Sequence, residues 1–219
     1  MPFTEPVILE LRKFLYFPEK PEKFDPMSLV DFLKLFIITL LFVAPYSALI
    51  YALGLYELQN EAIDLLEENL TVFLITAIIF APIYEEPIFR LHLDLTKKSI
   101  LWSLGVSVLL LFDSWIVVGV LGIYLIWLFV RVSRNNPPSL KLVVYSSAIL
   151  FGLVHLGNFT SLDYTKQFYL IPLLIGAQVF VGLVISFIRL RYGIKWAMIY
   201  HGVYNGIFTA VYLLIFGVE

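Results

Sequence analysis

The chain has 219 residues, of which 60% are hydrophobic and 15% charged, with a mean hydropathy of +0.89. A soluble domain of this length cannot bury so much apolar surface, so the composition predicts an all-α membrane protein with several spans. A net charge of −2 and a pI near 5.9 give no reason to expect a nucleic-acid partner. Cysteine is absent, which excludes disulfides, thiolate metal ligands and a cysteine nucleophile.

Residues 1–34 predict an extramembrane or interfacial arm in front of a membrane-embedded helical domain over residues 35–219. Charged side chains interrupt the apolar part of the arm, which argues against a signal peptide. As a helix on the membrane surface, the arm would carry on its apolar side Ile8, Leu9, Leu11, Phe14 and Leu15. A short arm outside the membrane is an equally good interpretation.

The rest of the chain contains seven stretches with the length or apolar character of membrane-spanning helices. In chain order they are residues 35–56, 70–95, 99–112, 114–130, 142–159, 167–188 and 196–218. The third and fourth flank Asp113 and predict a hairpin, because a single helix over both would be about 48 Å long, well beyond the bilayer core.

The charges favour this number of spans. With the N-terminus inside, fourteen of the fifteen Lys and Arg residues fall on the inner side, and only Lys166 falls outside. We therefore expect a polytopic membrane helix bundle of about seven transmembrane helices. This would be an integral, multi-pass protein of the cell (inner) membrane, surrounded by lipid bilayer.

The stretch IIFAPIYEEPIFRLHL places Glu85, Glu86 and Arg90 directly after residues 70–84, which carry no charge. An ionisable residue at membrane depth costs about 2.5–3.5 kcal/mol, so it is expected to have a partner or a function. Glu86 and Arg90 are four residues apart with the acid first, the favourable order for a supporting ion pair. Glu85 is rotated by about 100° and faces elsewhere. Pro82 and Pro87 predict that the helix breaks and restarts here, which would place the carboxylates near a helix N-terminus.

Three more polar residues lie in later spans: His155 in FGLVHLGNF, and His201 and Asn205 in YHGVYNG. Each alone is more typical of helix packing. Together with the free Glu85 they are the groups needed to activate a water molecule and to stabilise an oxyanion. The two histidines are also candidate ligands for one divalent metal, such as zinc. We expect these residues to converge on a polar cavity open toward the cytoplasm, although His201 lies nearer the inner side than the others.

Three motifs on separate spans, EEPIFR, FGLVH and HGVYN, resemble those of the CPBP family over roughly residues 70–217. This family includes type II CAAX prenyl endopeptidases, bacterial abortive-infection proteins and bacteriocin-processing or immunity proteins. The resemblance implies an intramembrane (metallo)endopeptidase, a protease acting on a membrane-associated peptide or protein substrate. It implies that Glu85 is the base that activates water. It further implies that His155 and His201 assist or bind metal, and that Asn205 helps to hold the oxyanion.

The chain departs from the family pattern at three points. Leu91 follows the arginine where the family usually has glycine, and Pro87 directly follows the glutamate pair. The interval from Glu85 to His155 is 70 residues, longer than the family's usual spacing, and the predicted hairpin accounts for the excess. A hairpin preserves sidedness, so the order of the motifs across the membrane is unchanged, while access for substrate can differ.

Two other functions fit parts of the sequence. A non-catalytic membrane binding protein, such as an immunity factor or a partner of another enzyme, could use the same fold, although it has no need of all four polar residues. An ion-coupled transporter could relay protons through glutamate and histidine. Such transporters often have broken helices in both halves, whereas this chain has one Pro-interrupted segment without a counterpart.

Overall fold

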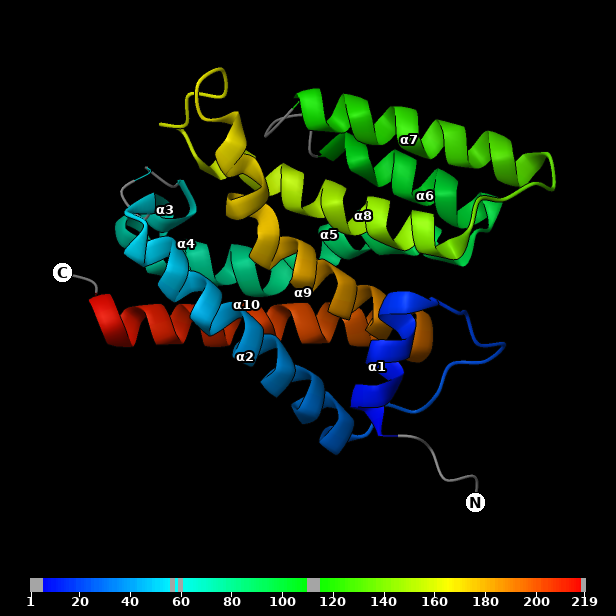
Figure 1. Ribbon diagram of the computed structural model, residues 1–219, viewed down its shortest axis with the longest axis horizontal. Coiled ribbons are helices and arrows are strands. Elements are labelled where there is room, and N and C mark those ends of the chain that lie inside the picture. The colour runs from blue at the N-terminus through cyan, green and yellow to red at the C-terminus, as the bar shows by residue number, and fades with distance from the viewer. Residues whose placement is uncertain (1–5, 56–57, 59–60, 110–114, 218–219) are drawn as a thin grey trace.

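The computed structural model describes residues 6–55, 58, 61–109 and 115–217. Within these ranges the chain is helical and contains no strand, as its composition predicts (Figure 1). The segments long and apolar enough to cross a membrane are Leu29–Ala52, Leu70–Asp94, Ile116–Ser133, Leu140–Asn158, Phe168–Tyr192 and Ile194–Ile215. The prediction of an all-α, polytopic helix bundle is confirmed.

The predicted hairpin is present, as α6 (Lys97–Ser107) packing along α7 (Trp115–Ser133). The described part of α6 is about 16 Å long, shorter than the bilayer core. Residues 110–114, which include Asp113 of the expected turn, lie outside the described ranges. Six helices of the described ranges are therefore long and apolar enough to span a membrane, and the count of seven spans stays a prediction.

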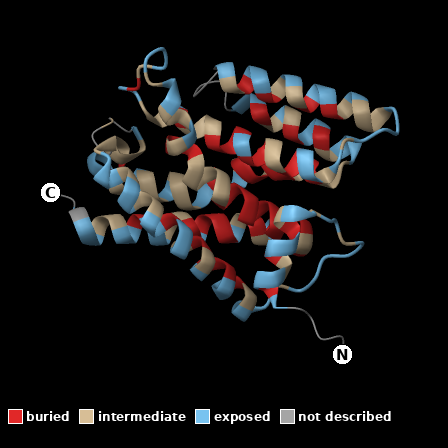
Figure 2. Ribbon diagram, in the orientation of Figure 1, coloured by how far each residue is buried: buried red, intermediate tan, exposed pale blue. Residues whose placement is uncertain are grey.

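The other helices pack around α9 (Ile171–Tyr192), which contacts α2 (Leu29–Ala52), α8 (Leu140–Val154) and α10 (Ile194–Phe216). Short elements cap the end of the bundle opposite α1: α3 (Glu61–Glu68), η5 (His155–Asn158) and η6 (Phe168–Leu170). Buried side chains concentrate in α5 (Ala81–Arg90) and in the second half of α9, and the first half of α10 adds several more (Figure 2). This is the part of the bundle in which polar groups are best shielded from water and lipid.

The N-terminal helix α1 (Val7–Tyr16) packs onto the bundle. Its buried side chains, which join the main hydrophobic core, are Val7, Leu11 and Phe14. Ile8 and Leu9 of the predicted apolar side are each 45% exposed, because contact with α2 and α9 buries a different stripe of the helix. The hydroxyl of Tyr145 on α8 donates a hydrogen bond to a backbone carbonyl of α1. The interfacial position of the arm stays a prediction.

The second span is one long helix whose type changes along its length. α4 (Leu70–Ile75) continues as the π-helix η2 (Thr76–Phe80), then as α5 (Ala81–Arg90) and the 3₁₀ turn η3 (Leu91–Asp94). The predicted break is therefore wrong, since Pro82 lies in the first turn of α5 and Pro87 inside it while the chain stays helical. Because η2 leads directly into α5, Glu85 and Glu86 lie in a helix interior and not at a free N-terminus.

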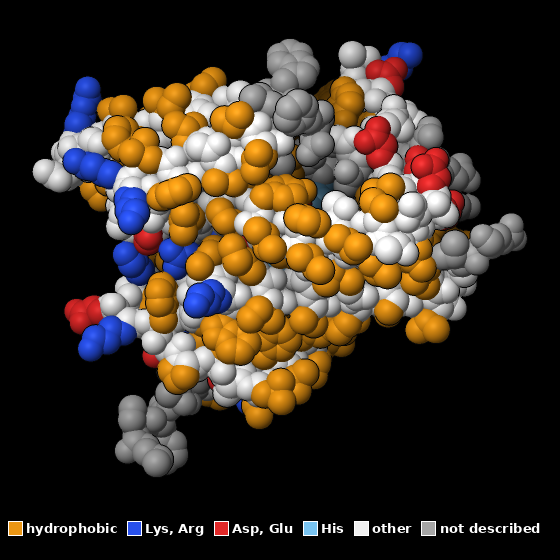
Figure 3. Space-filling view, turned by 180° about the vertical axis from the view of Figure 1, so that it is seen from behind, with side chains coloured by type: hydrophobic (Ala, Val, Ile, Leu, Met, Phe, Trp, Pro, Cys, Tyr) orange, Lys and Arg blue, Asp and Glu red, His pale blue; other side chains and the backbone are white. Residues whose placement is uncertain are grey.

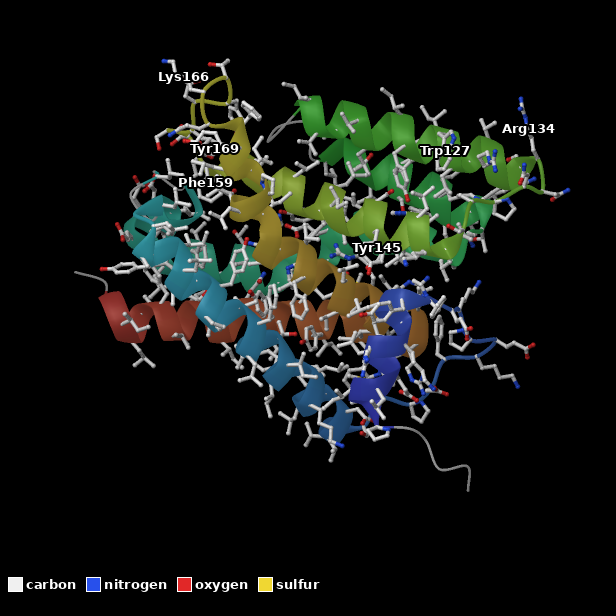
Figure 4. The ribbon with its side chains drawn as sticks, in the orientation of Figure 1. Trp127, Arg134, Tyr145, Phe159, Lys166 and Tyr169 are labelled. Carbon is white, nitrogen blue, oxygen red and sulfur yellow. The ribbon has the colours of Figure 1, made fainter. Side chains whose placement is uncertain are left out.

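Charged side chains divide between the two ends of the molecule. Lys and Arg gather at one end, with a few acidic side chains among them, and acidic side chains predominate at the other, with a broad apolar belt between the two ends (Figure 3). Arg134, after α7, lies at the first end, and Lys166 lies at the opposite end (Figure 4). This division follows the positive-inside rule, while the inward orientation of the basic end stays a prediction.

Candidate active site

Glu86 on α5 and His201 on α10 are joined by a hydrogen bond inside the bundle. His201 Nδ1 lies 2.8 Å from Glu86 Oε1, with side-chain exposures of 4% and 0%. An ionised carboxylate only accepts hydrogen bonds, so Nδ1 carries the proton that this contact uses. The orientation of the imidazole is thereby fixed, and its Nε2 atom faces the opposite direction.

Glu85 lies on the Nε2 side of the same imidazole. Its Oε2 atom is 3.9 Å from His201 Nε2, which is too long for a direct hydrogen bond. Glu85 is 9% exposed, whereas Glu86 is fully enclosed. Two carboxylates that are adjacent in the sequence therefore flank one imidazole, one at each ring nitrogen.

Arg90 is completely buried beside Glu86. Its Nε atom is 3.6 Å from Glu86 Oε2, so the ion pair that the i,i+4 spacing predicts is present. The guanidinium also lies over the ring of Phe151, with Cζ 4.0 Å from the ring centroid, a cation–π contact. Gly182 on α9 makes room for this arrangement, since a Cβ atom there would lie 3.1 Å from Arg90 Nη2.

Phe151 is a site residue that the sequence reasoning missed. Its ring also contacts His155 and His201 edge-on, with centroid separations of 4.7 and 5.8 Å. It is therefore the apolar side chain shared by the arginine and both histidines. The signal in the sequence was its place as the first residue of FGLVH, four residues before His155 and so on the same face of α8.

His155 lies at the end of α8 and begins η5. Its Nδ1 atom is 2.7 Å from the carbonyl oxygen of Phe151 in its own helix. It lies within the electrostatic reach of Glu85 and His201, but in the described part of the chain no hydrogen bond or ion pair joins it to Glu85. Since its side chain is also partly exposed, His155 is held less tightly than His201.

Asn205 on α10 donates a hydrogen bond from Nδ2 to Ala77 O, at 2.8 Å, in the π-helix η2. A π-helix displaces backbone carbonyls from the regular α-helical ladder, and the asparagine supplies a donor to one of them.

One turn earlier, a Cβ on Gly202 would lie 2.6 Å from Ile78 O. Pro82 has no N–H, so it leaves that carbonyl without its α-helical donor. α10 is thus fitted closely to the irregular part of the glutamate-bearing span.

His92 is buried, although its neighbours Lys97 and Lys98 predict a position at the membrane interface. It is 0% exposed, and its Nδ1 atom lies 3.2 Å from Ile88 O. Its Nε2 atom lies 3.4 Å from the hydroxyl of Tyr124 on α7. The α6–α7 hairpin covers this part of α5 and η3 and so buries the histidine, while its depth in the membrane stays a prediction.

The predicted metal ligands His155 and His201 do not assemble a metal site by themselves. Across the described ranges, no group of three or more His, Cys, Asp or Glu side chains is arranged to hold a metal ion. The Nδ1 atoms of both histidines are engaged, one with Phe151 O and the other with Glu86. These donors do not fit a structural zinc site, which has four protein ligands.

The family described as type II CAAX prenyl endopeptidase, Rce1-like, matches residues 67–207, which include all the site residues discussed above. The chain belongs to this family. The resemblance drawn from the three motifs is thereby confirmed. No curated protein and no solved structure matches the chain.

Membership of the Rce1-like family gives the broad activity of the protein. It is an integral membrane endopeptidase of the CAAX kind, and its substrate is a membrane-associated peptide in the bilayer. The structure adds that the Rce1-like motif residues of α5 and α10 are in direct contact within one buried cluster.

Proposed function

We propose that this Rce1-like protein hydrolyses its substrate with a water molecule activated by Glu85. The observation that carries the proposal is the 3.9 Å separation between Glu85 Oε2 and His201 Nε2. A water molecule bridging these atoms would hydrogen-bond to both. Glu85 is the less enclosed carboxylate of the pair, so it is the one that an entering peptide can approach.

The chemistry follows from this placement. Glu85 accepts a proton from the water as its oxygen attacks the carbonyl carbon of the scissile peptide bond. The carbonyl oxygen then becomes an oxyanion, and the second amide hydrogen of Asn205, beyond the one given to Ala77 O, is the candidate donor to it. Glu85 returns the proton to the amide nitrogen as the C–N bond breaks, which yields a carboxylate and an amine. His155 assists on the more exposed side of the cluster.

In this proposal Glu86 and Arg90 are positioning residues. Glu86 accepts the Nδ1 hydrogen of His201 and so holds Nε2 toward Glu85. Arg90 offsets the negative charge of Glu86, and both of these side chains are fully buried. No step requires a metal, and the experiment below includes a chelator. Because the basic end of the bundle is expected inside, we also propose that the site opens toward the cytoplasm of the cell (inner) membrane.

The test uses purified protein in detergent and peptides of one sequence, with and without a prenyl group on cysteine. The parent is compared with Glu85→Gln and with Lys166→Ala, a control in an exposed loop at the opposite end from the basic residues. The parent and the control should cleave, and Glu85→Gln should be about 10²–10⁴-fold slower. Each protein is also assayed with a chelator, and loss of the parent's activity there would show a metal requirement.

Cleavage that persists in Glu85→Gln would refute the role of this carboxylate. If the parent cleaves neither peptide, while Glu85→Gln loses a partner protein that the parent retains in a pull-down, the protein is the non-catalytic binding protein. Cleavage of the prenylated peptide alone would show that the lipid is part of what is recognised.

A further inference from the structure

The helix that carries the glutamate pair ends at Arg90, only four residues after Glu86. After Arg90 the chain continues as the 3₁₀ turn η3, so the regular ladder of α-helical hydrogen bonds changes at the carbonyls of residues 87–90. Three of the four accept hydrogen bonds from side chains, and each side chain comes from a different element. The C-terminal end of α5 is therefore held from outside.

The first of these contacts comes from the hairpin. Ser103 on α6 donates from Oγ to Pro87 O at 2.8 Å, and its side chain is 0% exposed. Pro87 directly follows Glu86, so this hydrogen bond fixes the backbone next to the glutamate pair. The third contact, from Ser147 on α8 to Phe89 O, holds the same end from another side.

The second contact also depends on the hairpin. His92 donates from Nδ1 to Ile88 O, which leaves its Nε2 atom as an acceptor. The hydroxyl of Tyr124 on α7 lies 3.4 Å from this nitrogen and 3.3 Å from Val143 O. The hydroxyl has one hydrogen for these two acceptors, and the ring of Tyr124 also packs edge-on against the ring of His92, with centroids 5.5 Å apart. Tyr124 therefore holds the ring of His92 through packing and a shared hydroxyl, in the orientation in which Nδ1 reaches the carbonyl of α5.

α5 needs this outside support because its own backbone ladder is incomplete. Pro87 has no N–H, so the carbonyl of Ile83 loses its normal i+4 donor in the turn that contains Glu85 and Glu86. Pro82 removes another donor one turn earlier. A helix that lacks two of its own hydrogen bonds shifts more easily than a regular one unless neighbouring side chains fix its end.

We infer that the α6–α7 hairpin is a positioning element for the reaction, acting through Ser103 and Tyr124. It sets the position of α5 along its axis and the rotation of α5 about that axis, and hence the position of Glu85 relative to His201 Nε2. The inference rests on the proposed function of Glu85. It gives a role to the segment that lengthens the interval between Glu85 and His155.

The test compares Ser103→Ala with Ser107→Ala. Ser107 is a matched control, since it lies one turn further along α6, is 2% exposed, and donates only to Leu104 O of its own helix. Ser103→Ala should lower kcat about tenfold or more while KM stays unchanged, because the substrate still binds and the base is displaced. Ser107→Ala should change neither constant. Tyr124→Phe should lower kcat in the same way by a smaller factor, and it provides a second variant if Ser103→Ala does not fold.

A second measurement does not depend on activity. Hydrogen–deuterium exchange of the peptide segment over residues 81–95 should be faster in Ser103→Ala than in the parent, and unchanged in Ser107→Ala. Faster exchange with unchanged kcat would overturn the inference, because the contact would then be only structural. Unchanged exchange would overturn it as well. A parent that cleaves nothing would refute the proposed function, and the exchange result would still show whether the hairpin holds α5.

Discussion

α10 and α8, two of the helices that pack against α5, contribute to the site in different ways. α10 makes direct polar contacts with the glutamate-bearing span, from His201 to Glu86 and from Asn205 to the backbone of η2. α8 meets the same cluster mainly through the ring of Phe151, while His155 binds a carbonyl of its own helix. The α10 side is also the more buried of the two at its histidine.

This difference suggests how a site with buried charges can be stable and still admit a peptide substrate. The α10 side is fixed, because moving it would strand a carboxylate or a backbone carbonyl in an apolar interior. The α8 side is partly exposed and has fewer specific contacts, so it can adjust when a peptide enters. Substitutions on the two sides should therefore differ in how they divide their effects between stability and activity.

The largest effect on stability is expected at Arg90, which contacts both Glu86 and the ring of Phe151. Arg90→Ala removes the positive charge beside Glu86 and leaves a fully buried carboxylate with less compensation, which should cost about 3–5 kcal/mol. Denaturant or thermal unfolding in detergent measures this. Arg131→Ala is the control, since Arg131 lies at the exposed end of α7 and binds only a nearby carbonyl. If the two variants unfold alike, the buried ion pair does not support the fold.

Substitution of each histidine tests whether the α10 side of the site is fixed and the α8 side adjustable. His201→Ala breaks a buried hydrogen bond to a carboxylate and should cost about 2–3 kcal/mol. His155→Ala breaks a bond to a backbone carbonyl and should cost about 1 kcal/mol. Both should slow cleavage about 10²-fold. Paired unfolding and activity measurements check this, and equal losses of stability would remove the distinction between the two sides.

Asn205→Ala should have a smaller effect, about 1–2 kcal/mol, because Ala77 O loses its side-chain donor in the π-helix. Thr209→Val is a matched control one turn later on α10, since Thr209 donates only to a carbonyl of its own helix. A stable Asn205→Ala variant that has lost cleavage would show that the amide serves the oxyanion alone. A destabilised variant that still cleaves at the parent's rate would show that it serves the backbone alone.

Features that depend on local physics could be predicted from the sequence. Apolar length and the division of charges indicated the spans, because insertion into a bilayer is decided segment by segment. The spacing of Glu86 and Arg90 indicated their ion pair, since both lie on one helix face. The three motifs indicated that Glu85 and His201 belong to one site.

Features that depend on distant partners could not be predicted. The burial of His92 could not be predicted, because its covering residue, Tyr124, is 32 positions away. The prolines predicted a break, but the chain stays helical, and the donor to a carbonyl of its π-helical turn comes from Asn205, 128 residues away. The expected difference in depth between His201 and Glu85 is absent, since the two side chains meet. The sequence does not show that a 3₁₀ turn and the left-handed residue Leu95 lie between Glu85 and the basic end of its span.

The central claim is that the adjacent glutamates divide their roles, with Glu86 holding the cluster and Glu85 acting on water. The most direct measurement is the melting temperature of Glu85→Gln and Glu86→Gln, side by side in the same detergent. Glu85→Gln should melt at or above the parent, because it removes a carboxylate that has no direct positive partner. Glu86→Gln should melt well below it, with a loss of about 3 kcal/mol, because Arg90 is left without its counter-charge. The reverse order, or equal melting of the two variants, would contradict the account.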